Sequence, residues 1–192
     1  MRRPFVIFAA LATLAARGAA QSSPTATSAP AASTAPAAPA ATPCADLADA
    51  RRFDWWVGEW DVRTPDGKPV GHNRVTRIAG GCGLQESWTA GNGSTGTSLN
   101  AFNPVAKQWQ QYWVGQYGAV TEYRRSEWHD GSLVLFADTR TKAGAPSITR
   151  LTFTPLPDGR VRQLFEQSTD DGRSWATTVD LYYHRIAGPA SR

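Results

Sequence analysis

Residue types that commonly carry catalysis or bind metal are scarce in this chain of 192 residues. It has three histidines and two cysteines. No pair of histidines has the spacing of a metal site, and no cysteine or serine lies near a histidine in a pattern typical of an activated nucleophile. The sequence therefore predicts no catalytic residues of these kinds and no bound metal.

The excess of positive charge is also small. The 20 Lys and Arg residues exceed the 16 Asp and Glu residues by four. Arg2, Arg3 and Arg17 lie in a segment that we expect to be removed, and the remaining 17 basic residues almost balance the 16 acidic ones. No basic stripe follows any one expected strand, so no nucleic-acid partner is expected.

Long apolar runs are missing except near the start, where positions 5–16 are mostly apolar. This run is shorter than the roughly 20 residues that a membrane-spanning helix needs. It follows an arginine pair and precedes small residues that end at Ala20, which is typical of a secretory signal peptide. We therefore expect residues 1–20 to be a signal peptide cleaved near Ala20. The mature protein should be secreted or periplasmic, with no transmembrane segment.

The next segment cannot form a core. Residues 22–43 consist only of Ala, Pro, Ser and Thr, which offer little apolar surface to offset the entropy lost on ordering. We expect a disordered linker over 21–43, one folded domain over 44–186, and a flexible tail over 187–192.

Export would place the two cysteines in an oxidising compartment, where pairing is more common than free thiols. A Cys44–Cys82 disulfide would close a loop of about 39 residues and pin the start of the domain to the fold. The alternative is that they are two unrelated thiols.

Beyond the linker the hydrophobic pattern has a period of two, which predicts strands. Turns rich in Gly, Asp, Asn and Pro separate them, as in antiparallel hairpins. Only 46–54 could form a short helical turn, with Asp46 as its N-cap. The expected strands are 55–64, 69–79, 83–90, 95–102, 108–114, 119–128, 132–140, 147–155, 160–168 and 174–185.

An all-β fold of about ten short strands must bury one face of its sheet and avoid exposed, unpaired edge strands. Closure into an antiparallel up-and-down barrel does both, and a two-sheet sandwich is the alternative.

Gly58-Glu59-Trp60 resembles the Gly-x-Trp signature that opens the first strand of lipocalins and other calycins. In those barrels the tryptophan closes the bottom of the cup beneath a cationic side chain from near the end of the barrel. The resemblance implies a structural role for Gly58 and Trp60, and it makes Arg185 the candidate for a guanidinium on the indole face.

The wider chain, over about 44–185, resembles a family of exported bacterial lipocalin-like proteins of unknown function. The shared motifs are F-D-x-W-x-G-x-W at 53–60, G-C-x-x-x-E-x-W at 81–88, S-L-N at 98–100 and W-x-Q-x-W at 109–113. The resemblance implies a barrel with a pocket but no particular reaction.

A more distant resemblance is to nitrobindins, whose ten-stranded barrels hold haem through a histidine inside the barrel. Here His72, His129 and His184 are all expected on the surface, and His184 lies opposite the apolar residues of its strand. We therefore expect no cofactor and keep haem as an alternative that these positions do not favour.

Several polar residues are expected on the inner face together with tryptophans. Polar groups inside an apolar barrel need hydrogen-bond partners, so they either satisfy one another or fix the polar end of a ligand. Buried Glu86 would have a raised pKa unless Arg150 pairs with it. The expected ligand-binding residues are Glu86, Trp88, Asn100, Trp109, Gln111, Trp113, Arg150 and Gln163.

Residues 168–175 fit the Asp-box pattern of sialidase propeller hairpins, but the pattern occurs once. We expect it to brace a hairpin through local hydrogen bonds.

The favoured function is the binding of a small apolar or amphipathic molecule in an aromatic-lined barrel. Three alternatives stay open: an enzyme that uses Glu86, a haem protein, and a structural domain whose barrel is filled by its own side chains.

Overall fold

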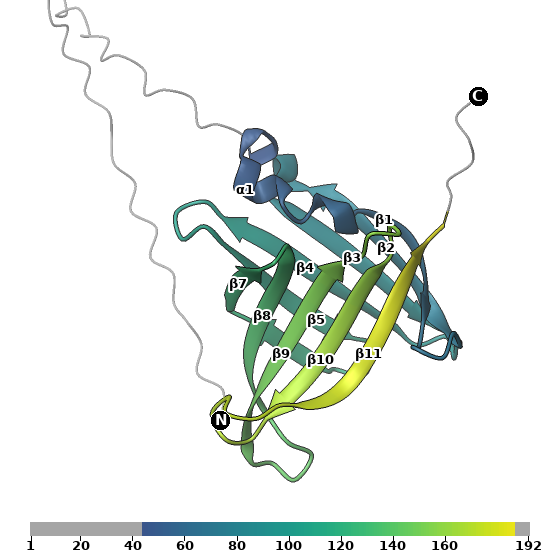
Figure 1. Cartoon of the computed structure of the whole chain (residues 1–192), viewed down its shortest axis with the longest axis vertical. Helices are drawn as coiled ribbons and strands as arrows, with labels where there is room; N and C mark the ends of the chain where they lie inside the picture. The colour runs from purple at the N-terminus through teal and green to yellow at the C-terminus, as the bar shows by residue number, and fades with distance from the viewer. Residues whose placement is uncertain (1–43, 187–192) are drawn as a thin grey trace, which may run out of the picture. The chain divides into compact units, whose positions relative to one another are not determined.

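The computed structural model describes residues 44–186. The predicted signal peptide (1–20), linker (21–43) and tail (187–192) lie outside these residues and stay predictions. The described chain forms a nearly closed antiparallel β-barrel with short helical turns ahead of its first strand (Figure 1). This confirms the predicted all-β fold class and barrel architecture.

The helical turns are short and lie together at one end of the barrel (Figure 1). Three are 3-10 turns and one is an α-helical turn, whose N-cap is Leu47 without a side-chain hydrogen bond. The expectation that Asp46 caps this helix is therefore wrong, because Asp46 belongs to the preceding turn. The turns are η1 (Cys44–Asp46), α1 (Ala48–Arg51), η2 (Asp54–Trp56) and η3 (Ala79–Gly81).

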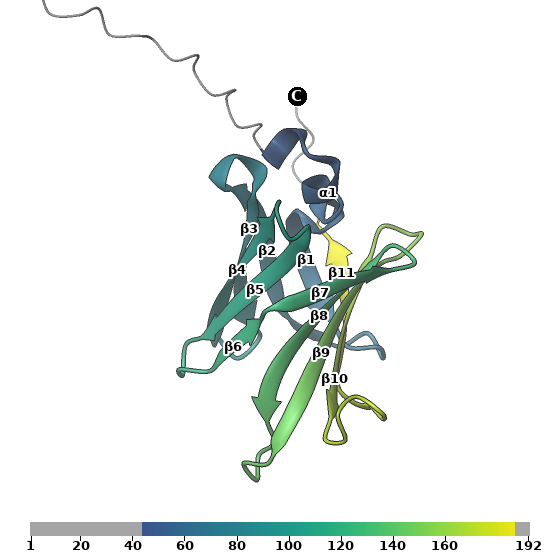
Figure 2. The same ribbon diagram turned by 90° about the vertical axis from the view of Figure 1, so that its left-hand side faces the viewer.

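Eleven strands form one sheet in the order β6-β5-β4-β3-β2-β1-β11-β10-β9-β8-β7. Strands that follow one another in sequence lie side by side, apart from β6 and β7, as an up-and-down barrel requires. Figure 2 shows β3, β4 and β5 on one side of the barrel and β8, β9 and β10 on the other. The strands are β1 (Gly58–Arg63), β2 (Pro69–Ile78), β3 (Gly83–Ala90), β4 (Thr95–Asn103), β5 (Gln108–Gly115), β6 (Val120–Tyr123), β7 (Arg125–His129), β8 (Ser132–Arg140), β9 (Pro146–Pro155), β10 (Val161–Ser168) and β11 (Ala176–Arg185).

The eleventh strand arises because the expected strand 119–128 is broken at Arg124. Its first half, β6, pairs with β5 and its second half, β7, pairs with β8. The backbone N–H of Arg124 donates to the carbonyl of Phe136 at 3.2 Å. This segment therefore passes from one edge of the sheet to the other and brings the two edges together.

The seam between these edges is held partly by side chains rather than by a regular backbone ladder. The backbone N–H of Trp109 donates to the Ser126 hydroxyl at 3.0 Å. The Gln110 side chain donates to the Arg124 carbonyl at 3.2 Å. These bonds satisfy backbone groups that an open edge would leave unpaired.

Aromatic side chains fill the end of the barrel beneath the helical turns. Phe53 stacks on Trp56 with ring centroids 5.0 Å apart, and Trp56 lies 4.6 Å from Phe153. Trp109 packs edge-on against Phe53 at 5.3 Å. These four side chains are fully buried, so this end of the barrel is closed by its own core.

Arg185 and Trp60 adopt the arrangement that the Gly-x-Trp resemblance implied. The guanidinium carbon lies 4.1 Å from the indole centroid, and the guanidinium donates to the carbonyls of Val57 and Trp55 at 2.8 and 2.9 Å. Gly58 has φ of 145°, and a Cβ there would overlap the guanidinium. Glycine is therefore required at this position.

Cys44 and Cys82 form a disulfide with Cα atoms 4.8 Å apart, which confirms the predicted pairing. It joins the first described turn to the connection between β2 and β3. Within residues 44–186 no helix is long and apolar enough to cross a membrane.

Candidate functional site

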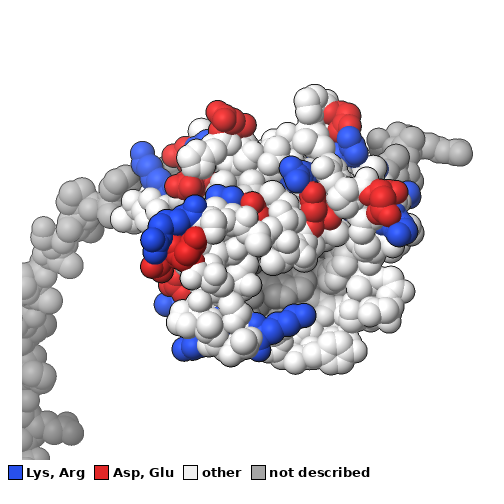
Figure 3. Space-filling view, turned by 60° about the horizontal axis from the view of Figure 1, so that its bottom comes forward, with Lys and Arg blue, Asp and Glu red and all other residues white. Residues whose placement is uncertain are grey.

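A cavity of about 390 Å³ lies inside the barrel, toward the end opposite the helical turns. Figure 3 brings that end forward and shows a hollow ringed mainly by residues other than Lys, Arg, Asp and Glu. The volume falls within the range of small-molecule pockets. The lining residues are Glu86, Trp88, Gln111, Trp113, Thr121, Tyr123, Thr149, Gln163, Phe165, Val179, Leu181 and Tyr183.

The inward-facing residues change character in the same order along two strands. From the mouth toward the closed end, β3 presents Trp88, Glu86 and Leu84. On β5 the matching order is Trp113, Gln111 and Trp109. Each strand thus runs from an aromatic residue through a polar one to an apolar core residue, which gives the cavity aromatic upper walls and a polar lower layer.

Two glycines leave room for the indoles at the mouth. A Cβ on Gly71 would lie 2.6 Å from the Trp88 ring, and a Cβ on Gly96 would overlap the Trp113 ring. Both indoles therefore lie over a glycine of a neighbouring strand, an arrangement in which an aromatic ring covers a strand glycine. Their other faces remain available to line the cavity.

Glu86 accepts hydrogen bonds on both carboxylate oxygens. Asn73 donates to Oε1 at 2.9 Å, and the Ser98 hydroxyl donates to Oε2 at 2.6 Å. Ser98 itself accepts from Asn100 at 2.9 Å, and Asn100 accepts from Gln111 at 2.8 Å. Four neighbouring strands, β2 to β5, therefore contribute to one network that ends on Glu86.

Burial raises the pKa of Glu86 from 4.5 to about 7, although the hydrogen bonds from Ser98 and Asn73 act in the opposite direction. The side chain is only 3% exposed. Removal of the carboxylate from water disfavours the ion more than two neutral donors stabilise it. The group therefore changes charge near neutral pH.

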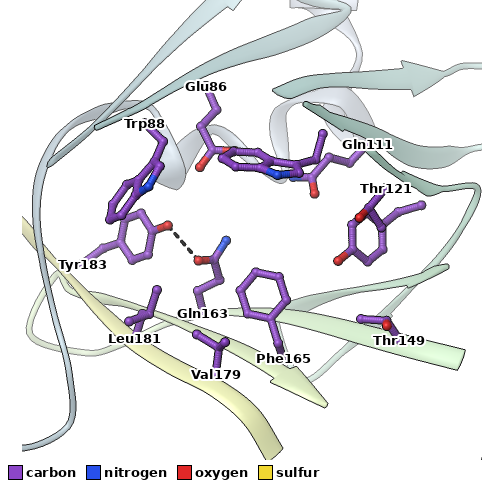
Figure 4. A pocket seen from close by; sticks show the side chains of 12 residues that line it. Glu86, Trp88, Gln111, Thr121, Thr149, Gln163, Phe165, Val179, Leu181 and Tyr183 are labelled. Atoms are coloured by element: carbon purple, nitrogen blue, oxygen red, sulfur yellow. Dashed lines mark hydrogen bonds between the residues drawn. The ribbon is translucent and has the colours of Figure 1, made fainter. Parts of the chain in front are cut away.

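Across the cavity, the Tyr183 hydroxyl donates to Gln163 Oε1 at 2.8 Å (Figure 4). Burial and the nearby charge of Glu86 raise the pKa of Tyr183 well above its usual value. The same two causes raise the pKa of Tyr123. Both phenols therefore stay neutral over the range in which Glu86 titrates.

Five of the eight expected ligand-binding residues line the cavity: Glu86, Trp88, Gln111, Trp113 and Gln163. Asn100 is 1% exposed and lies behind the lining, where it links Ser98 to Gln111.

The expectation that Trp109 lines the pocket is wrong. Its ring packs against Phe53 and Phe102, with centroids 5.3 and 5.8 Å apart, in the closed end. Trp109 shares a strand face with Trp113, as predicted. The two residues are four positions apart on β5, and over this distance the barrel interior changes from packed core to cavity.

The expectation that Arg150 pairs with Glu86 is also wrong. Thr149 lines the cavity, so the next residue on β9 points to the outer face. There the Arg150 guanidinium pairs with Glu166 at 2.7 Å and lies 4.2 Å from the Trp175 ring centroid. Glu86 therefore has no cationic partner among the described side chains.

Several residues of the site were not predicted from the sequence. Asn73 and Ser98 hold Glu86, and Tyr123, Phe165 and Tyr183 line the cavity. Alternation along each strand could have identified two of them, because Phe165 shares a strand face with Gln163, and Tyr183 shares one with Leu181. Ser98 belongs to the S-L-N motif at 98–100, whereas no local signal identifies Asn73, because its partner lies on another strand.

The histidines lie outside the cavity lining. His184 alternates with Tyr183, which faces inward, and pairs across the sheet with Asp61. His129 lies on the surface, 2.9 Å from Glu127. In residues 44–186 no group of three or more His, Cys, Asp or Glu side chains could hold a metal ion.

The hairpin at 168–175 has the local bonds that its pattern predicted. Ser168 accepts from the backbone of Gly172 at 2.9 Å, and Asp170 accepts from the backbone of Ser174 at 2.9 Å. The Trp175 indole donates to the Gly172 carbonyl at 3.0 Å. These bonds brace the turn between β10 and β11.

Comparison with known proteins adds no relative: no protein-family model matches the chain, and no match is found among curated proteins.

Proposed function

We propose that this protein binds a small molecule with an apolar body inside its barrel. The observation that carries the proposal is an unfilled cavity of about 390 Å³ with aromatic upper walls and a polar lower layer. Pockets that bind small molecules combine apolar walls with a few placed polar groups. A barrel that served only as a structural unit would be filled by its own side chains at this level, as it is at the closed end.

Binding is better supported than catalysis by Glu86. Acid–base chemistry needs a second group positioned on the reacting atoms, and one candidate, the Tyr183 hydroxyl, is engaged by Gln163. The carboxylate oxygens of Glu86 are engaged by Asn73 and Ser98. This arrangement holds a charge in place and offers no activated nucleophile.

We also propose that the protein works outside the cytoplasm and is related to the exported lipocalin-like family. The Cys44–Cys82 disulfide supports the first proposal, since such bonds persist in oxidising compartments. The barrel and the stacking of Arg185 on Trp60 support the second. N-terminal sequencing of the protein from culture medium or periplasm tests export, and an N-terminus before position 20 would contradict cleavage there.

Binding can be tested with N-phenyl-1-naphthylamine, a neutral probe whose fluorescence rises in apolar sites. We expect saturable enhancement with one site per chain. Leu181→Trp, which adds bulk to the cavity wall, should abolish this signal. Leu99→Trp makes the same kind of change at a side chain that is 52% exposed and should bind the probe normally.

Circular dichroism would establish that both variants fold. Absence of binding to the wild-type protein would overturn the proposal. Equal binding by folded Leu181→Trp would also overturn it, because the probe would then lie elsewhere.

A further inference from the structure

The polar layer of the cavity contains one group that can carry a negative charge, the carboxyl group of Glu86. Among the described residues that line the cavity, Glu86 is the only one of the Asp, Glu, Lys, Arg or His type. Asn73, which donates to Glu86, has its own Oδ1 buried without a hydrogen-bond partner among the described atoms. A ligand that brings positive charge would complement this layer.

In each hydrogen bond of the network around Glu86, the donor lies on the far side and the acceptor lies on the side of Glu86. Gln111 donates to Asn100, Asn100 donates to Ser98, and Ser98 donates to Glu86, over distances of 2.6 to 2.9 Å. Hydrogen bonds in such a chain polarise one another and strengthen the last donor. The network is therefore oriented to support a carboxylate anion rather than a neutral acid.

No protein cation balances this anion within residues 44–186. None of the ion pairs among the described side chains includes Glu86, and the nearest expected partner, Arg150, pairs with Glu166 on the outer face. A buried ion without a partner is costly, which agrees with the raised pKa of Glu86. Among the described residues no counter-charge faces Glu86, and a cationic ligand would supply it.

The walls above Glu86 suit a cation with an apolar body. Aromatic rings attract cations to their faces, and five aromatic residues line the cavity. Figure 4 shows Glu86 and Trp88 on one side, with Phe165 and Leu181 across from them. The aromatic lining residues are Trp88, Trp113, Tyr123, Phe165 and Tyr183.

We propose that the cavity takes an organic ammonium ion, with the ammonium group on Glu86 and an aryl-sized apolar body between the aromatic walls. This inference rests on the proposed binding function and narrows its ligand to an amine. A neutral ligand would leave Glu86 without a counter-charge, and an anionic ligand would be repelled by it.

The proposal predicts a pH dependence of a definite sign. Glu86 faces Asn73 of β2 and Ser98 of β4, which do not titrate, and the tyrosines Tyr123 and Tyr183, whose raised pKa values keep them neutral. An ammonium ion binds the charged form of Glu86, so its affinity should fall about tenfold for each pH unit below about 7. At about pH 7 its binding should release about half a proton.

Two probes of nearly equal shape separate charge from apolar binding: 2-phenylethylamine, which is an ammonium ion at neutral pH, and neutral 2-phenylethanol. Titration calorimetry of the wild-type protein at about pH 8 should give at least about tenfold tighter binding of the amine. Lowering the pH to about 5.5 should remove this preference. Repeating the titration in buffers of different ionisation enthalpy measures the proton release.

Glu86→Gln should lose the preference for the amine over 2-phenylethanol and the pH dependence of that preference. Glu59→Gln removes a carboxylate that is 61% exposed on β1 and should behave as the wild type. If Glu86→Gln does not fold, the wild-type comparison of the two probes against pH decides the question alone.

Equal affinity of the wild-type protein for amine and alcohol would overturn the inference and leave the binding function standing. Tighter binding of the alcohol as the pH falls would also overturn it, because Glu86 would then act as a hydrogen-bond donor to a neutral ligand. Failure to bind either compound or the naphthylamine probe would overturn the proposed function itself.

Discussion

Replacement of Glu86 by glutamine should change how the stability of the ligand-free protein depends on pH. The carboxylate is 3% exposed, and burial raises its pKa from 4.5 to about 7. Glutamine has nearly the same shape and cannot ionise. The comparison therefore isolates the free energy of ionising a buried group.

The sign follows from proton linkage. The folded protein holds the proton of Glu86 more tightly than the unfolded chain, so between about pH 4.5 and 7 folding takes up protons. The stabilisation from protonated Glu86 is fully present below about pH 4.5 and is lost as the pH rises through about 7. A rise in pKa from 4.5 to about 7 corresponds to about 3 kcal/mol, at 1.36 kcal/mol per pH unit.

Urea unfolding at a series of pH values, with the disulfide intact, measures this difference. The free energy of unfolding of the wild type should fall by about 3 kcal/mol relative to Glu86→Gln between about pH 4.5 and 8. Glutamine places an amide N–H₂ where Ser98 or Asn73 now donates, which shifts the whole curve of the variant but not its slope. Glu59→Gln should give a curve parallel to the wild type.

Parallel curves for the wild type and Glu86→Gln would refute the reasoning, since Glu86 would then ionise alike in the folded and unfolded chain. A wild-type curve that rises with pH relative to the variant would refute it as well, and would indicate a cationic partner for Glu86.

Three further predictions concern the scaffold. Reduction of the Cys44–Cys82 disulfide should lower the free energy of unfolding by up to about 4 kcal/mol, and unchanged urea unfolding in reductant would contradict this. Gly58→Ala should destabilise the protein by more than about 1 kcal/mol, because a methyl group at φ 145° overlaps the Arg185 guanidinium; an unchanged midpoint in thermal unfolding would count against it. Arg150→Ala should leave probe binding and its pH dependence intact, because Arg150 lies on the outer face. Loss of the preference for the amine in that variant would instead indicate that Arg150 acts on Glu86.

Most strands could be predicted because their signals are local. Alternation of apolar and polar side chains follows from the pleat of a single strand, and Gly or Asp turns mark its ends. The strands at 83–90 and 132–140 begin and end where the sequence predicts. The expected orientation of His184, opposite Tyr183, has the same local origin.

The break at Arg124 could not be predicted in this way. Residues 119–128 contain no Gly, Pro, Asn or Asp that would mark a turn, and the break occurs because the segment joins β5 on one edge to β8 on the other. Closure of a barrel depends on the whole sheet, so no turn residue is needed to mark its seam.

The sequence also did not determine how deep in the barrel each inward-facing residue lies. Trp109 and Trp113 share a face by alternation, but only packing of the N-terminal turns on one end places Trp109 in the core and Trp113 in the cavity. The misplacement of Arg150 was avoidable, because Leu151 and Phe153 of the same strand show which positions face inward.

The sequence by itself determined the fold class and the alternation of faces along most strands, since these depend on neighbours along the chain, and it indicated the disulfide because the chain contains only two cysteines. Only the tertiary structure decided the environment of Glu86. Its donors, Asn73 and Ser98, come from strands on either side, and its pKa depends on how completely the barrel excludes water. Both are consequences of sheet register and closure, which bring together side chains whose local sequences carry no trace of one another.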